Sequence, residues 1–185
     1  MWNMGLLGAS APAAAGAFDL LETTVLASSA SSVTFSGLGA YSDYKHLQIR
    51  WVAKSTANNQ DHLKLTFNGS SASSYVDHNL NGDGSAVSSN ASSPSQTYIR
   101  LLFANAYSGA PGFASGVMDV LDFSSASKNT TIRSLHGYQY PVQRTRIVLS
   151  SGAWFNTTAV TSLTLTAFSD QLAANSRFSL YGIKG

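Results

Sequence analysis

The chain of 185 residues carries few charges, because Asp, Glu, Lys and Arg make up 11% of it, against about a quarter of an ordinary soluble domain. The formal net charge is +2 and the basic residues form no run, which argues against electrostatic binding to nucleic acid. The sequence has no Cys, which excludes disulfides, thiolate nucleophiles and Cys-based zinc sites. No window approaches the roughly 20 apolar residues of a membrane span. From the charge and the hydropathy together, we expect neither nucleic acid nor a membrane as a partner.

Residues 1–17 are uncharged and rich in Gly and Ala, with a few large apolar side chains among them. The glycines and Pro12 interrupt this stretch and no Lys or Arg precedes its Ala-rich part, so we interpret it as an extended arm and not as a signal peptide. Burying one large apolar side chain contributes about 1.5–3 kcal/mol. We therefore predict that Trp2, Leu6 and Leu7 anchor the arm to a partner; a disordered terminus is the alternative.

Residues 18–185 are predicted to form a single β-sandwich domain. In residues 46–54 the apolar side chains Leu47, Ile49 and Trp51 alternate with polar ones, and residues 62–67 show the same period of two. This alternation is typical of half-buried antiparallel strands. Eleven strands are expected, which fit two packed antiparallel sheets, and they cover residues 20–26, 32–36, 46–54, 62–67, 74–79, 97–103, 116–123, 131–136, 144–150, 162–168 and 177–183.

The stretch 81–95 is predicted to be an exposed loop. Just before it, residues 77–83 match the first half of a calcium-binding loop, with oxygen-bearing side chains at alternate positions. The match fails at its twelfth position, where Ser88 stands instead of the Glu that closes such a site. We therefore predict a hairpin turn of the Asn-Gly or Asp-Gly type and no metal site.

The sequence lacks the residue patterns of common catalytic sites. No G-x-S-x-G motif occurs, and none of the four His residues has a metal-ligand spacing. Asp119 and Asp122, the candidate carboxylate pair, point to opposite faces if they lie on one strand, and Glu22 is the only glutamate. We expect the protein not to be an enzyme and to use no cofactor. Among the aromatic residues, Tyr138 and Tyr140 are predicted to lie in a loop, where they would serve as interface or sugar-stacking residues.

Several segments resemble a known family, the small β-sandwich virion proteins of tailed bacteriophages, especially those of cyanophages and marine phages. The resemblance begins at residues 22–36, with the sequence ETTVLASSASSVTFS, and ends at residues 176–185, with SRFSLYGIKG. Between them it covers residues 44–50, 67–69, 81–85, 117–122, 133–135 and 161–165.

The resemblance implies a jelly-roll-like sandwich and a structural role in the virus particle. The expected function is that of a capsid cement or decoration protein, trimeric, on the outer surface of the capsid. Its partner would be the major capsid protein, on which the N-terminal arm would lie. The alternative is a tail-fibre or receptor-binding module that recognises host-surface glycans.

Overall fold

A computed structural model describes residues 16–58, 61–103, 112–139 and 145–185. Twelve strands and one short 3-10 helix form in these ranges, and none of their helices is long and apolar enough to cross a membrane. The elements are β1 (Phe18–Val25), β2 (Ser32–Ser36), η1 (Leu38–Tyr41), β3 (His46–Ala53), β4 (Asp61–Phe67), β5 (Tyr75–Gly82), β6 (Val87–Ala91), β7 (Ile99–Phe103), β8 (Ala114–Leu121), β9 (Thr130–Gln139), β10 (Thr145–Trp154), β11 (Ser162–Ala167) and β12 (Arg177–Ile183).

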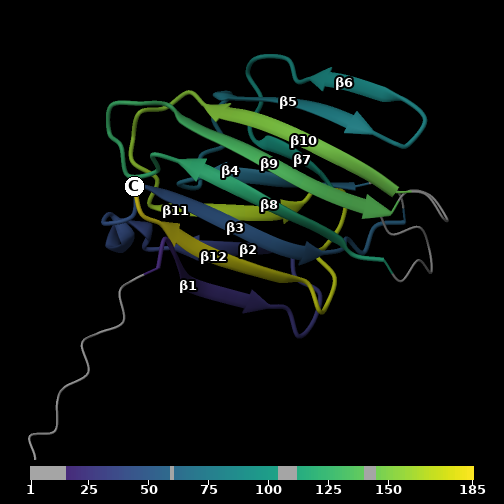
Figure 1. Ribbon diagram of the computed structural model, residues 1–185, viewed down its shortest axis with the longest axis horizontal. Coiled ribbons are helices and arrows are strands. Elements are labelled where there is room, and N and C mark those ends of the chain that lie inside the picture. Colours follow the sequence, from purple (N-terminus) through teal and green to yellow (C-terminus); the bar gives the residue numbers. More distant parts are fainter. Residues whose placement is uncertain (1–15, 59–60, 104–111, 140–144) are drawn as a thin grey trace, which may run out of the picture.

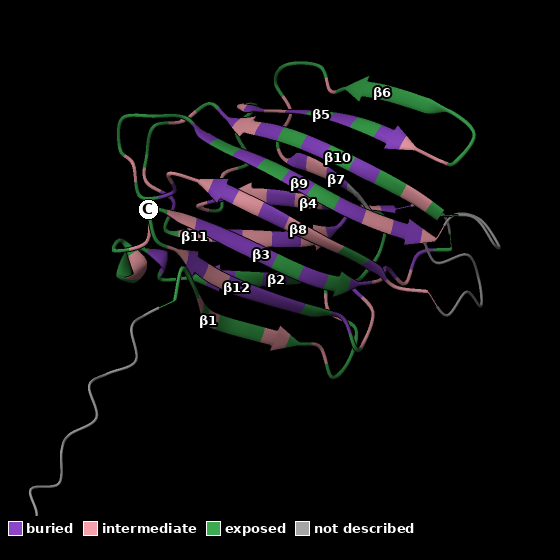
Figure 2. Ribbon diagram, in the orientation of Figure 1, coloured by how far each residue is buried: buried purple, intermediate pink, exposed green. Residues whose placement is uncertain are grey.

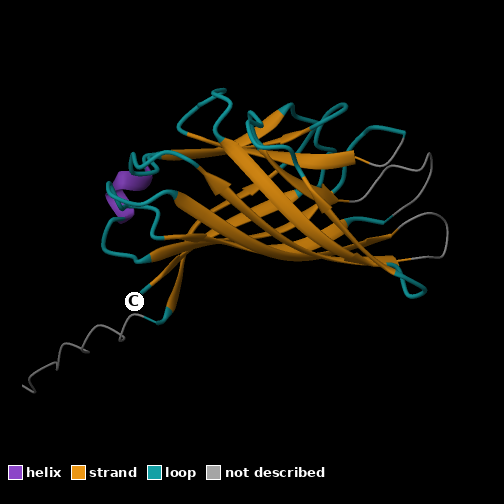
Figure 3. Cartoon of the chain, turned by 90° about the horizontal axis from the view of Figure 1, so that it is seen from above, coloured by secondary structure: helices purple, strands orange, loops and turns teal. Residues whose placement is uncertain are grey.

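The strands form two unequal antiparallel sheets, which Figure 1 shows face on. The large sheet has eight strands in the order β1-β12-β3-β8-β9-β10-β5-β6, and the small sheet has four in the order β2-β11-β4-β7. The two sheets lie one above the other (Figure 3). The predicted all-β, two-sheet sandwich is therefore confirmed, whereas its jelly-roll connectivity stays a prediction.

The core lies between the sheets and follows from the alternation seen in the sequence. On β4, Leu63, Leu65 and Phe67 are fully buried, and the residues between them are partly exposed. Phe67 packs against two aromatic residues of the large sheet, with ring centroids 5.6 Å from Trp154 and 6.5 Å from Tyr75. The Tyr75 hydroxyl accepts a hydrogen bond of 3.0 Å from the Phe67 amide, so its polar end is satisfied within the core.

The predicted loop 81–95 is wrong in part, because residues 87–91 form strand β6. Figure 2 shows β6 exposed along its whole length, as expected for this stretch. Its Ser- and Asn-rich sequence has low β propensity and no apolar alternation, so nothing local marks it as a strand. It pairs with β5 because the chain reverses at the predicted Asp-Gly turn, where Gly84 has a φ of +87° and Asp83 Oδ1 accepts hydrogen bonds from the Ser85 and Ala86 amides.

Candidate binding surfaces

Of the candidate calcium ligands, Asp77, Asn79 and Asn81 lie on β5, and Asp83 lies in the turn that follows it. Tyr75 packs in the core at the start of β5, and the period of two then turns Asp77, Asn79 and Asn81 toward the interior as well. The Asn81 side-chain amide, through Nδ2, donates a hydrogen bond of 2.8 Å to Asn79 Oδ1. Among the described residues, no group of three His, Asp or Glu side chains is placed to hold a metal ion.

The candidate carboxylates Asp119 and Asp122 occupy separate hydrogen-bonding networks. Asp119 accepts hydrogen bonds from Arg133 Nε and Gln48 Nε2, each at 2.8 Å. Asp122 follows β8 with a φ of +47° and contacts Lys128 Nζ at 2.6 Å and Lys45 Nζ at 3.2 Å. The two acids therefore do not form one catalytic pair.

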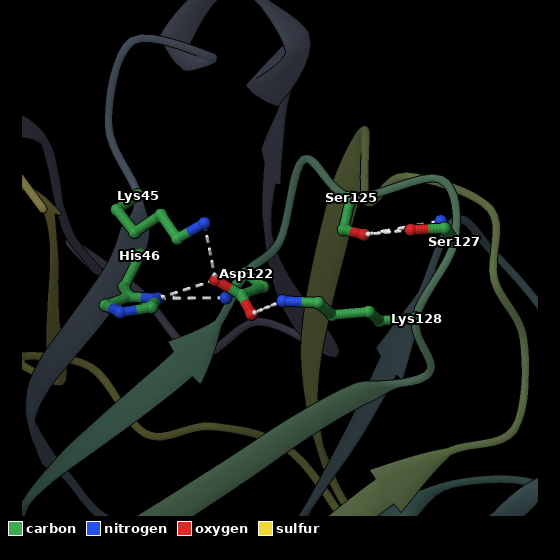
Figure 4. A network of polar contacts seen from close by, with 6 residues as sticks. All are labelled: Lys45, His46, Asp122, Ser125, Ser127 and Lys128. Atoms are coloured by element: carbon green, nitrogen blue, oxygen red, sulfur yellow. Dashed lines mark hydrogen bonds and ion pairs between the residues drawn. The ribbon is translucent and has the colours of Figure 1, made fainter.

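The environment of Asp122 suits a structural role. Figure 4 shows its carboxylate between Lys45 and Lys128, with His46 beside it. Hydrogen bonds from Lys128 and then Lys45 lower the pKa of Asp122 below its usual 3.8, whereas a general acid needs a raised pKa. The Asp122 amide donates to His46 Nδ1 at 2.9 Å, so this imidazole nitrogen acts as an acceptor. These contacts connect the end of β8 to the start of β3.

The predicted aromatic loop is wrong at Tyr138. This residue lies on β9 with its side chain 3% exposed, because the alternation of β9 turns it inward; Tyr140 lies outside the described residues. Trp2, Leu6 and Leu7 also lie outside the described residues, so the anchoring arm stays a prediction.

The outer face of the large sheet carries a continuous apolar row that crosses four neighbouring strands. Leu80 on β5 pairs with Leu149 on β10, which pairs with Leu135 on β9, which pairs with Val117 on β8. The three leucines are exposed by 48%, 53% and 47%. In the adjacent row Ile147 is 58% exposed. We call these five residues the apolar face.

Two shallow depressions follow the apolar face. The larger, about 460 Å³, lies between β3, β8, β9 and β10, and the second, about 400 Å³, lies where β5, β10 and β9 meet. A glycine helps to form the first, because Gly137 pairs with Ile147 and brings no side chain. The surface is therefore apolar and hollowed on both sides of Leu149 and Leu135.

Polar side chains border the apolar face. The row next to it contains Arg133 and Asp119, which form an ion pair of 2.8 Å. Arg50, which is paired with Val117, donates to Gln48 Oε1 at 2.8 Å and stacks over the Tyr181 ring at 4.7 Å. An apolar centre with a hydrogen-bonded polar rim is the usual composition of a protein interface.

A second surface lies on the opposite side of the sandwich, around Tyr98 just before β7. Two depressions of about 280 Å³ each meet at this residue. One is lined by polar side chains that include Asp77, Asn90 and Arg100, and the other by Lys64 and several hydroxyl-bearing residues. Sequence analysis did not single out this site, because its residues come from five strands, β4, β5, β6, β7 and β11, and from the segments between them.

Comparisons of the chain with protein-family models, with curated proteins and with solved structures find no match. The function is therefore inferred from the two surfaces and the sequence itself.

Proposed function

We propose that the chain is a structural protein of a bacteriophage particle, and more narrowly a cement or decoration protein that binds the major capsid protein. The apolar face is the observation that carries this proposal. A monomeric domain rarely exposes a large continuous apolar patch unless another surface covers it. The resemblance to small phage virion proteins indicates the class of partner, which is a capsid protein.

In this proposal the protein acts by adding contact area and not by catalysis. A capsid cement protein bridges neighbouring capsid subunits, so it needs a rigid body and an adhesive face. The sandwich supplies the rigid body, the apolar face supplies the adhesive surface, and the N-terminal arm with Trp2, Leu6 and Leu7 extends the contact. A trimer would present three such faces and would increase avidity without any new type of contact.

The location of the protein on the particle tests the proposal. Immunogold electron microscopy with an antibody against residues 18–185 should label the outer surface of the head. Deletion of residues 1–17 should remove the protein from purified particles while leaving the sandwich folded. Label confined to the tail, or absent from every particle, would contradict the cement role.

A tail-fibre or receptor-binding module is the second candidate function. The specific observation in its favour is the polar surface at Tyr98, which combines an aromatic ring with hydroxyl, amide and charged side chains. Such a combination is typical of sites for polar small molecules, including saccharides. Label on the tail, together with glycan binding by the isolated protein, would favour this candidate.

A further inference from the structure

Two cationic residues occupy directly opposed positions on neighbouring strands of the small sheet. Lys64 on β4 is the direct cross-strand partner of Arg100 on β7. Like charges in directly opposed positions destabilise an antiparallel sheet. Among the described residues, Lys64 forms no ion pair, and its ammonium group lies 5.7 Å from the ring centroids of both Tyr98 and Phe168. The surface thus keeps an unfavourable pair of positive charges.

One buried carboxylate compensates only part of this charge. Asp77, 1% exposed, lies with its Oδ1 3.6 Å from Arg100 Nε, while its Oδ2 accepts a hydrogen bond of 3.4 Å from the Arg100 amide. The Arg100 guanidinium also donates to Asn90 Oδ1 at 3.1 Å. The neighbouring His62 adds no charge at neutral pH, because burial lowers its pKa to about 4. The site therefore has a net positive charge.

The shape and the lining of the site narrow the class of ligand. Each of the two depressions measures about 280 Å³, close to the lower end of small-molecule sites, which begins near 300 Å³. Each thus suits one ring-sized unit, and the two together suit consecutive units of a polymer. Ser and Thr hydroxyls line both depressions, and the side-chain amides of Asn90 and Gln96 line one of them.

We propose that this surface binds an acidic saccharide, with its carboxylate or sulfate group held by Lys64, one sugar ring packed against Tyr98, and Arg100 adding positive charge in the neighbouring depression. The hydroxyl and amide groups of the walls would exchange hydrogen bonds with the sugar hydroxyls. A nucleic acid fits less well, because its binding depends on many phosphate contacts and this site offers two cations. The inference rests on the second candidate function in one respect: it requires that the protein is a binding module. It is independent of the apolar face, because Lys64 and Arg100 belong to the small sheet and the apolar face is the outer face of the large sheet.

Affinity electrophoresis of the full chain in gels that contain a polysaccharide tests the inference. The probes are polygalacturonate for carboxylates, dextran sulfate for sulfates and unmodified dextran as the neutral reference. The wild-type protein should be retarded by at least one acidic polymer and not by dextran. Lys64→Gln should weaken this binding about tenfold, as expected for the loss of one charged hydrogen bond. Lys184→Gln is the matched control, because it removes the same charge beside β12 on the large sheet and should bind as the wild type does.

Tyr98→Ala tests the ring contact and should also weaken binding, and circular dichroism verifies that the variant is folded. Arg100 is left unchanged, since its removal would leave the buried Asp77 without its cation. Equal retardation by dextran and by the acidic polymers, or equal binding by Lys64→Gln and the wild type, would overturn the inference. The absence of any retardation of the folded wild-type protein would also overturn it. None of these outcomes alters the prediction for particle binding, which depends on Leu149 and its neighbours.

Discussion

Leu149 and Leu135 are direct cross-strand partners on the outer face of the large sheet, and each leaves about half of its side chain in water, 53% and 47% respectively. Leu80 and Val117 continue the same row to the strands on either side. Burying this row against a partner would gain roughly 25 cal/mol for each Å² of apolar area covered. The pairing of these two leucines therefore marks the centre of the proposed interface.

Leu149→Asp should abolish attachment to the particle and leave the fold intact. A charge in the centre of a desolvated interface is costly, whereas the side chain is already half exposed in the free protein. Co-sedimentation with particles that lack the protein measures the attachment. Phe155→Asp is the matched control, because Phe155 is 54% exposed and lies after the end of β10. Full attachment of the Leu149 variant would remove the apolar face from the interface.

Asp61→Ala should lower the free energy of unfolding by about 2–4 kcal/mol. The Asp61 carboxylate is 1% exposed and accepts hydrogen bonds from Ser55 Oγ at 2.6 Å and from the Ser169 amide at 3.1 Å. Its removal leaves the buried Ser55 hydroxyl without this acceptor. Urea unfolding measures the change, and Asp61→Asn, which keeps one acceptor oxygen, should cost less. Equal stability of the wild type and the Ala variant would contradict this account.

Stability should fall as the pH drops from about 6.5 to about 4, because of His62. Burial lowers the pKa of this imidazole from 6.5 to about 4, so the folded state disfavours a proton that the unfolded state accepts. The contribution of neutral His62 to the free energy of unfolding is fully present above pH 6.5. It is lost as the pH falls toward the pKa of His62 in the folded state. A shift of this size corresponds to about 3 kcal/mol, and partial exposure reduces it to roughly 1–2 kcal/mol.

Urea unfolding between pH 7 and pH 4.5 measures the effect of His62. Asp122 contributes little in this window, because its pKa is lowered below 3.8 and its stabilisation is lost only at more acidic pH. His62→Gln should flatten the pH dependence. An unchanged slope in this variant would assign the effect to another group.

Gly116→Ala should destabilise the fold by about 1–3 kcal/mol. A Cβ atom at this position of β8 would overlap the Trp51 indole and lie 2.6 Å from the Cβ of His136. Gly39→Ala is the matched control, because nothing lies within 4 Å of the added atom and its backbone φ is not positive. Thermal unfolding should show a clear loss for the first variant only; similar melting temperatures for both would contradict the close packing at Gly116.

Local sequence was sufficient to predict a strand where one face of that strand is consistently apolar. The alternation around residues 46–54 and 62–67 predicted β3 and β4, and the Asp-Gly turn was also predicted. The same reasoning missed β6, since Val87–Ala91 has no alternating pattern and becomes a strand only by pairing with β5. It also missed the Tyr98 site, whose cations Lys64 and Arg100 are brought together by the register of β4 and β7.

By itself, the sequence determined the fold class, because a period of two and frequent turns allow few solutions other than packed antiparallel sheets. Only the tertiary structure decided which side faces the core on strands that lack a clear alternation. Ile147, Val148 and Leu149 are three consecutive apolar residues, and local pattern does not assign their sides; the pairing of β10 buries Val148 and exposes the other two. On β5 the core position of Tyr75 turns Asp77 inward and leaves Leu80 outside. Both surfaces arise in this way, because strand pairing is a long-range interaction that overrides the preference of a single side chain.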